Sequence, residues 1–142
     1  MKTVQETRFE YKGFPCVVLF QSMGHRCGYV GLPKGNRFYG KHFSEIDDDI
    51  SCHGGFTYSR NKLILQEDTD LWWIGFDCAH CFDKMDYEKA KEYFSDNKGV
   101  MEAILYRENM DAFFGDCGQM VRTLEYCIEE CKSIVDQIVG DE

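Results

Sequence analysis

Apolar positions in the first half of the chain are spaced as in strands. Polar and aromatic residues alternate over residues 8–11, Lys12-Gly13 provides turn chemistry, and residues 15–20 form a β-rich run, so this segment predicts a hairpin. Three further apolar runs also predict strands, namely residues 27–32, 61–66 and 71–76. Residues 37–49, between the predicted strands 27–32 and 61–66, have no such pattern and are expected to form a loop.

After residue 83 the apolar spacing becomes helical. Asp86 is a candidate N-cap for a helix that continues to residue 94, and residues 101–110 predict a second helix. The last helix has the clearest pattern, with Gly140 as its stop signal and apolar residues at steps of three and four: Val121, Leu124, Ile128, Cys131, Val135 and Ile138. The order of elements predicts an α+β fold, a small antiparallel sheet followed by C-terminal helices, in a single domain over residues 1–142.

Charge and composition narrow the classes of partner. The net charge is −9, which argues against direct binding of nucleic acid and is compatible with a basic protein partner. No apolar run approaches the ~20 residues of a membrane span, and the N-terminus lacks the apolar core of a signal peptide. We therefore expect a cytoplasmic protein whose eight cysteines are thiols or metal ligands rather than disulfides.

Ligand-type residues are concentrated directly after the most apolar run, at residues 77–83. Gly75 interrupts that run and indicates a bulge or a close backbone approach. One possible ligand set is Cys78 and Cys81, which have the spacing of half a zinc knuckle, with Cys27 or Cys52 supplying the remainder. That set lacks the second closely spaced cysteine pair that a four-cysteine site requires.

The second possible ligand set contains histidine and aspartate. Asp77, His80 and Asp83 are spaced three residues apart, which in a turn or a first helical coil keeps their side chains on nearly one face. His53 precedes Gly54-Gly55, where the backbone can pass close to another group. A site of this composition suits zinc, or a harder cation such as manganese or iron. The alternative is that these histidines and aspartates are hydrogen-bonded residues and helix caps without an ion.

Motifs for other chemistries are absent from the sequence. It contains no nucleophile elbow, phosphate-binding loop or dinucleotide fingerprint. A metal ion bound by histidine and aspartate can activate water, so a small metal-dependent hydrolase is an alternative to a binding protein. No additional side chain stands out as a general base for such an enzyme.

Three segments together resemble a family of small proteins from bacteriophage and prophage genomes. They are residues 24–33, residues 51–58 with the His-Gly-Gly motif, and residues 72–80 with the Gly-Phe-Asp-Cys-Ala-His motif; residues 122–137 resemble the family's closing helix. Asp83 matches the family pattern and Cys81 does not, which favours His53, Asp77, His80 and Asp83 as metal ligands. Phe82 departs from the glycine that the family tends to have, which puts the local turn geometry in doubt.

Within this group the sequence looks most like a metal-containing anti-CRISPR inhibitor of Cas9. The resemblance implies a non-enzymatic protein that acts in the cytoplasm of a bacterial host by binding a defence nuclease. It also implies one transition-metal ion, for which zinc is the expected identity, in a structural role. The ligand count separates this expectation from the hydrolase, because a structural site is closed by four protein ligands and a catalytic site keeps a position for water.

Overall fold

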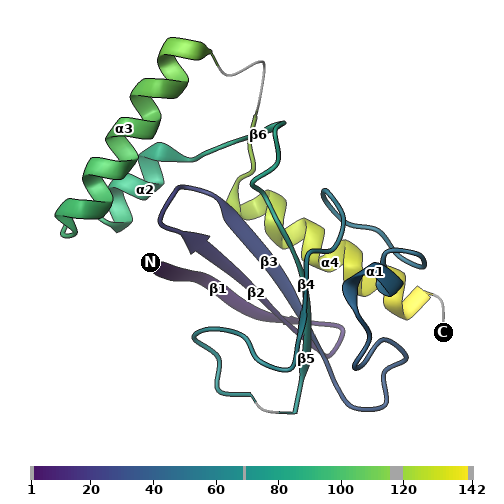
Figure 1. Cartoon of the computed structure of the whole chain (residues 1–142). Helices are drawn as coiled ribbons and strands as arrows, with labels where there is room; N and C mark the ends of the chain where they lie inside the picture. Colours follow the sequence, from purple (N-terminus) through teal and green to yellow (C-terminus); the bar gives the residue numbers. More distant parts are fainter. Residues whose placement is uncertain (1, 69, 116–119, 141–142) are drawn as a thin grey trace.

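Five antiparallel strands form the main sheet of the computed structural model (Figure 1), which describes residues 2–68, 70–115 and 120–140. The strands are β1 (Thr3–Tyr11), β2 (Phe14–Gln21), β3 (Arg26–Leu32), β4 (Tyr58–Arg60) and β5 (Trp72–Asp77), and their order in the sheet is β1-β2-β3-β5-β4. The predicted hairpin is confirmed, and both residues of its turn, Lys12 and Gly13, have positive φ. The predicted α+β class is also confirmed.

Strand β5 carries the candidate site at its C-terminal end and is held on both sides. It pairs with β3 from Leu32↔Trp72 to Cys27↔Asp77 without a register shift, and with β4 on its other side. A Cβ atom at Gly75 would lie 2.6 Å from the backbone carbonyl oxygen of Gly28 and 2.4 Å from Cδ1 of Tyr29. The close backbone approach predicted for Gly75 is therefore confirmed, and the alternative of a bulge is wrong.

The predicted strand over residues 61–66 is wrong. These residues form a loop after the short strand β4, because only Leu63 is buried while Ile64 and Leu65 are more than half exposed. Leu65 also adopts a left-handed backbone, with φ 66°, which a strand cannot accommodate. The predicted loop at residues 37–49 contains one short helix, α1 (Phe43–Ile46), which buries Ile46.

Three longer helices follow the sheet: α2 (Tyr87–Tyr93), α3 (Lys98–Phe114) and α4 (Leu124–Gly140). The predicted N-cap is confirmed, since the Asp86 carboxylate accepts a hydrogen bond of 3.1 Å from the amide of Lys89. Helix α3 extends beyond both ends of the predicted segment. Val121 lies outside α4, in strand β7 (Met120–Val121), which pairs in parallel with β6 (Asp83–Lys84) as a small second sheet that the sequence pattern did not predict.

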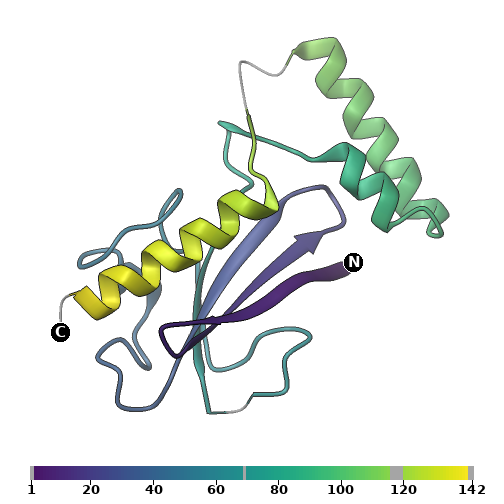
Figure 2. The ribbon, with the colours of Figure 1, turned by 180° about the vertical axis from the view of Figure 1, so that it is seen from behind.

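Helix α4 covers one face of the main sheet (Figure 2). Its inward side chains are fully buried against residues of β2, β3 and β5, and they are Cys127, Cys131, Ile134, Val135 and Ile138. Each buried aliphatic side chain of this kind stabilises the fold by about 1.5–3 kcal/mol. The two cysteines pack here as small apolar residues.

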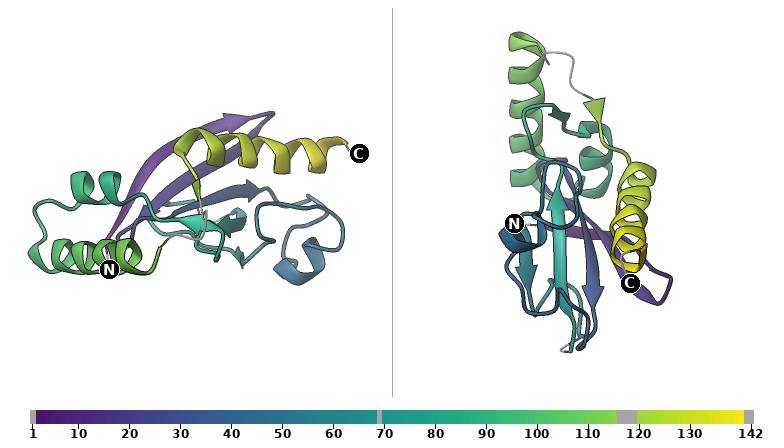
Figure 3. Two further views of the ribbon diagram at one scale, coloured as in Figure 1. Left: turned by 90° about the horizontal axis from the view of Figure 1, so that it is seen from above. Right: turned by 90° about the vertical axis from the view of Figure 1, so that its right-hand side faces the viewer.

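The opposite face of the sheet is covered by the loop after β4, through Leu63 packed beside Trp73. Helices α2 and α3 lie beyond one end of the sheet (Figure 3), where they pack around Phe20. No helix in the described part of the chain is both long and apolar enough to cross a membrane.

Candidate metal centre

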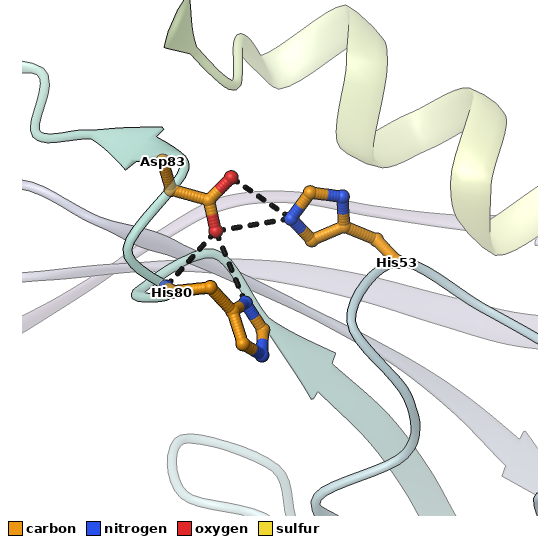
Figure 4. A group of neighbouring side chains, drawn as sticks. All are labelled: His53, His80 and Asp83. Carbon is orange, nitrogen blue, oxygen red and sulfur yellow. Dashed lines mark hydrogen bonds and ion pairs between the residues drawn. The ribbon is translucent and has the colours of Figure 1, made fainter. Parts of the chain in front are cut away.

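Three of the four predicted ligands meet at the C-terminal end of β5. His53, His80 and Asp83 each offer one ligand atom, and these atoms lie within 4.8 Å of one another (Figure 4). His53 Nε2 is 2.9 Å from Asp83 Oδ1 and 3.0 Å from Oδ2, and His80 Nδ1 is 3.1 Å from Asp83 Oδ2. Residues from two distant segments therefore converge on one carboxylate.

The turn after β5 positions His80 and Asp83. The amide of Asp83 donates to the carbonyl of His80, and the amide of His80 donates to Asp83 Oδ2. The Phe82 ring stacks on the His80 ring with centroids 5.3 Å apart. Phe82, which departs from the resembled family's glycine, is thus accommodated at the surface, where it covers His80.

His53 is held by contacts with helix α4. Its amide donates to Glu130, and its Nδ1 is 2.7 Å from the hydroxyl of Tyr126. A histidine that ligates a metal through one ring nitrogen usually has the other nitrogen fixed by such a contact. The Tyr126 contact therefore orients Nε2 of His53 toward Asp83 in the manner of a ligand.

Arg122 adds a fourth group to the network. Its Nε donates to Asp83 Oδ1 at 3.0 Å, and its guanidinium lies over the rings of Phe82 and Tyr126. The backbone carbonyl of Arg122 accepts from Arg26, which is buried and also pairs with Glu6 and Asp86. Arg26 thus ties the segment before α4 to the segment that follows the site.

Asp83 is ionised in this setting. Burial by itself would raise the pKa of its carboxyl group, but the hydrogen bonds from His53, from the amide and ring of His80, and from Arg122 outweigh burial and lower the pKa below its usual value. An ionised carboxylate is the form that binds a metal ion.

The geometry fits a small transition-metal ion. Ligand atoms around tetrahedral zinc are about 3.3 Å apart, given zinc–ligand distances of about 2.0–2.1 Å. The observed separations from Asp83 to the two histidines are a few tenths of an ångström shorter, and all three ligand atoms lie within 4.8 Å of one another, so the three side chains would have to adjust their mutual distances to admit an ion. Without an ion the same atoms form a closed hydrogen-bond network. Metal analysis of the purified protein distinguishes these two states.

Asp77 lies beside this group but has other partners. Its Oδ1 accepts from the amide of Ala79 and its Oδ2 accepts from the hydroxyl of Thr57, while Oδ1 is 3.9 Å from His80 Nδ1. Asp77 therefore stabilises the turn after β5, and the structure does not bring it into the three-residue group.

The alternative cysteine set is not assembled among the described residues. Cys78 lies in the core with its Sγ 3.8 Å from Cys127 Sγ, whereas Cys81 is exposed on the turn. The hydrogen bond with Cys127, together with burial, raises the pKa of Cys78. Burial also raises the pKa of Cys27 to about 12 and that of Cys52 further, so neither thiol is readily ionised. Cys117 lies outside the described residues.

Sequence reasoning missed the three α4-side residues that support the centre. Arg122, Tyr126 and Glu130 are spaced four residues apart and contact Asp83 or His53. Tyr126 and Glu130 lie on one side of α4, and Arg122 precedes the helix at the same four-residue step, a pattern that is visible in the sequence. Their partners are distant in the chain, however, so the pattern alone did not indicate what they contact.

Gly54 gives a specific test of the centre. Its φ is 68°, and a Cβ atom there would lie 2.2 Å from Cε1 of His80, so Gly54→Ala should displace the His80 ring. We expect zinc affinity, measured by competition with a chromogenic chelator, to fall at least about tenfold. Gly55→Ala is the matched control, because Gly55 also has positive φ but its Cβ would meet only Asp47, at 3.4 Å. Equal zinc affinity in the two variants would contradict this role for Gly54.

Comparisons with known proteins identify no relative of this chain. The sequence matches no protein-family model, no curated protein and no solved structure. The chemistry of the centre therefore rests on its own geometry.

Proposed function

We propose that this chain is an acidic metal-binding protein that acts by binding a host defence nuclease, with Cas9 as the specific candidate. In this proposal His53, His80 and Asp83 hold one transition-metal ion, zinc, which has a structural role. The protein would act in the cytoplasm of a bacterial host and inhibit its target by direct contact, without chemistry of its own.

The burial of the ligands is the observation that carries the structural role. The side chain of Asp83 is fully buried and that of His53 is 4% exposed, which leaves little access for a substrate. The group also joins the loop around His53, the turn after β5 and, through Arg122, the segment that leads into α4. An ion held by such distant segments contributes its binding free energy to folding.

Two features support a protein target. The His-Gly-Gly and Gly-Phe-Asp-Cys-Ala-His motifs resemble those of the phage family, and one histidine of each motif, His53 and His80, belongs to the centre. A net charge of −9 favours encounter with a cationic surface, which enzymes that bind nucleic acid present.

A small metal-dependent hydrolase is the second candidate, and the ligand count favours it. Only three side chains of the described residues converge, and catalytic zinc sites typically have three protein ligands and a water. The His80 side chain is 25% exposed, which gives one side of the centre contact with solvent. An ion in such an enzyme would supply an activated water. Burial raises the pKa of Tyr126, so its phenol is not an activated base.

The two candidates make opposite predictions for one assay. Purified zinc-loaded protein should slow DNA cleavage by Cas9 in proportion to its molar ratio, and it should not turn over phosphate or carboxylate esters. Multiple-turnover ester hydrolysis by the wild type, lost in a folded His80→Ala variant, would contradict the proposal and favour the hydrolase. Cas9 activity that is unaffected by excess zinc-loaded protein would remove Cas9 as the target.

A further inference from the structure

Helix α3 is attached to the rest of the molecule by one face. Val100, Met101 and Ile104 pack against α2 and Phe20, and Ile104 is the only residue of α3 that is fully buried. Farther along the same face, Glu108 pairs with Lys91, and Asp111 accepts a hydrogen bond from Tyr87. Ile104, Glu108 and Asp111 are spaced i, i+4 and i+7, so they lie on one side of the helix.

The opposite side of α3 carries large apolar side chains that contact little. Tyr106, Met110, Phe113 and Phe114 follow the spacing i, i+4, i+7 and i+8, which forms a second stripe on the side away from α2. We call these four residues the outer stripe of α3. Tyr106 is 65% exposed, Phe113 is 82% exposed and Phe114 is 70% exposed. Figure 3 shows this helix beyond the end of the sheet, away from α4.

This exposure is costly in water, and none of the described residues, 2–68, 70–115 and 120–140, covers most of the surface of Tyr106, Phe113 or Phe114. Single exposed apolar residues are normal, but a contiguous apolar stripe along a helix is typical of an interaction site. Apolar anchors at this spacing are also how a helix docks into an apolar groove of a partner.

Net charge distinguishes two possible partners for the outer stripe, a second copy of this chain and a cationic protein. A second copy of the chain would bring together two molecules that each carry a net charge of −9, which opposes their association. A cationic protein has the opposite charge and would be attracted at long range. Arg107, at the edge of the stripe, is the one basic residue between Tyr106 and Phe114.

We propose that the outer stripe of α3 is the docking element of this protein, and that it inserts into an apolar groove on a cationic protein surface. This inference rests on the proposed function, because it assigns a contact surface to the nuclease partner. The long-range charge would supply the encounter, and the aromatic side chains would supply most of the affinity. The metal centre does not form part of this surface.

The test uses full-length, zinc-loaded protein and purified Cas9 as the probe. Tyr106→Ala and Phe113→Ala should each weaken binding, measured by surface plasmon resonance, by about tenfold or more, with most of the change in the dissociation rate. Ile64→Ala is the matched control, since Ile64 is 57% exposed and apolar but lies in the loop after β4. All three variants should keep the wild-type melting temperature, because none removes a buried side chain.

Hydrogen exchange of the wild-type complex provides a readout that does not depend on variants. Amides of residues 105–114 should be protected by Cas9, and protection confined to other segments would overturn the inference. Binding that is unchanged in both α3 variants would overturn it while leaving the proposed function in place. Failure of the wild type to bind Cas9 would overturn both proposals. A dimer in light scattering that Phe113→Ala dissociates would assign the stripe to a second copy instead.

Discussion

Replacing Asp83 with alanine should destabilise the metal-free protein by about 3–5 kcal/mol, the usual effect of removing one partner from a buried charge network. Asp83 is fully buried and is the shared acceptor of His53, His80 and Arg122. Its loss leaves the Arg122 guanidinium and the His53 ring without their acceptor, at a position where solvent has little access to replace the carboxylate. The same substitution should abolish metal binding.

Urea unfolding of Asp83→Ala and Asp77→Ala measures this effect with a matched control. Asp77 is an aspartate six residues away, partly exposed and bound to a turn amide, so its replacement should cost no more than about 1 kcal/mol. Equal destabilisation by the two substitutions would contradict the central role of Asp83.

The effect of Asp83 should also depend on pH in a defined direction. Its pKa is lower in the folded protein than in the unfolded chain, where it is about 3.9. The ionised carboxylate therefore stabilises the fold above about pH 4, and this stabilisation is lost as the pH falls through the folded value. The stability difference between metal-free wild type and Asp83→Asn should shrink correspondingly below pH 4.

Removal of the metal should lower the melting temperature by about 10 °C. An ion that binds only the folded state stabilises it by about 3–4 kcal/mol when its free concentration exceeds the dissociation constant by 100- to 1,000-fold. For a chain of this length that energy corresponds to a shift of this size. Differential scanning calorimetry with stoichiometric zinc and with excess chelator measures the difference.

The chelation experiment also distinguishes a structural ion from a catalytic one. With a structural ion, Cas9 inhibition should fail over the same temperature range in which the chelated protein unfolds. Restored zinc should recover both the melting temperature and the inhibition. A chelated protein with the wild-type melting temperature would contradict the structural role.

Local patterns in the sequence predicted most of the main sheet and the helices. They failed where tertiary contacts determine the backbone conformation. The hairpin, β3, β5 and the buried side of α4 follow directly from apolar spacing. Residues 61–66 have strand-type composition, yet only Leu63 finds a buried position and Leu65 takes a left-handed backbone, so a loop forms. The full length of α3 was missed because apolar residues lie on two opposite sides of that helix and obscure a single stripe.

The candidate site was also predictable only in part, because local patterns reveal the ligand types but not their tertiary contacts. The density of ligand types at residues 77–83 and the glycines after His53 predicted which segments meet, and the structure brings His53, His80 and Asp83 together. Asp77 has the correct spacing, but Ala79 and Thr57 occupy its carboxylate, a contact that spacing alone does not reveal. The contributions of Arg122 and Tyr126 depend on the docking of α4, which brings together residues far apart in the chain.

Elemental analysis of the purified protein tests the metal centre most directly. Wild-type protein prepared without added metal should contain close to one equivalent of a transition-metal ion, with zinc expected, and Asp77→Ala should retain it. His53→Ala and His80→Ala should each contain almost none, because each removes one of three ligands. Full occupancy in both histidine variants, or a folded wild type that contains no metal and binds none on addition of zinc, would contradict the metal centre.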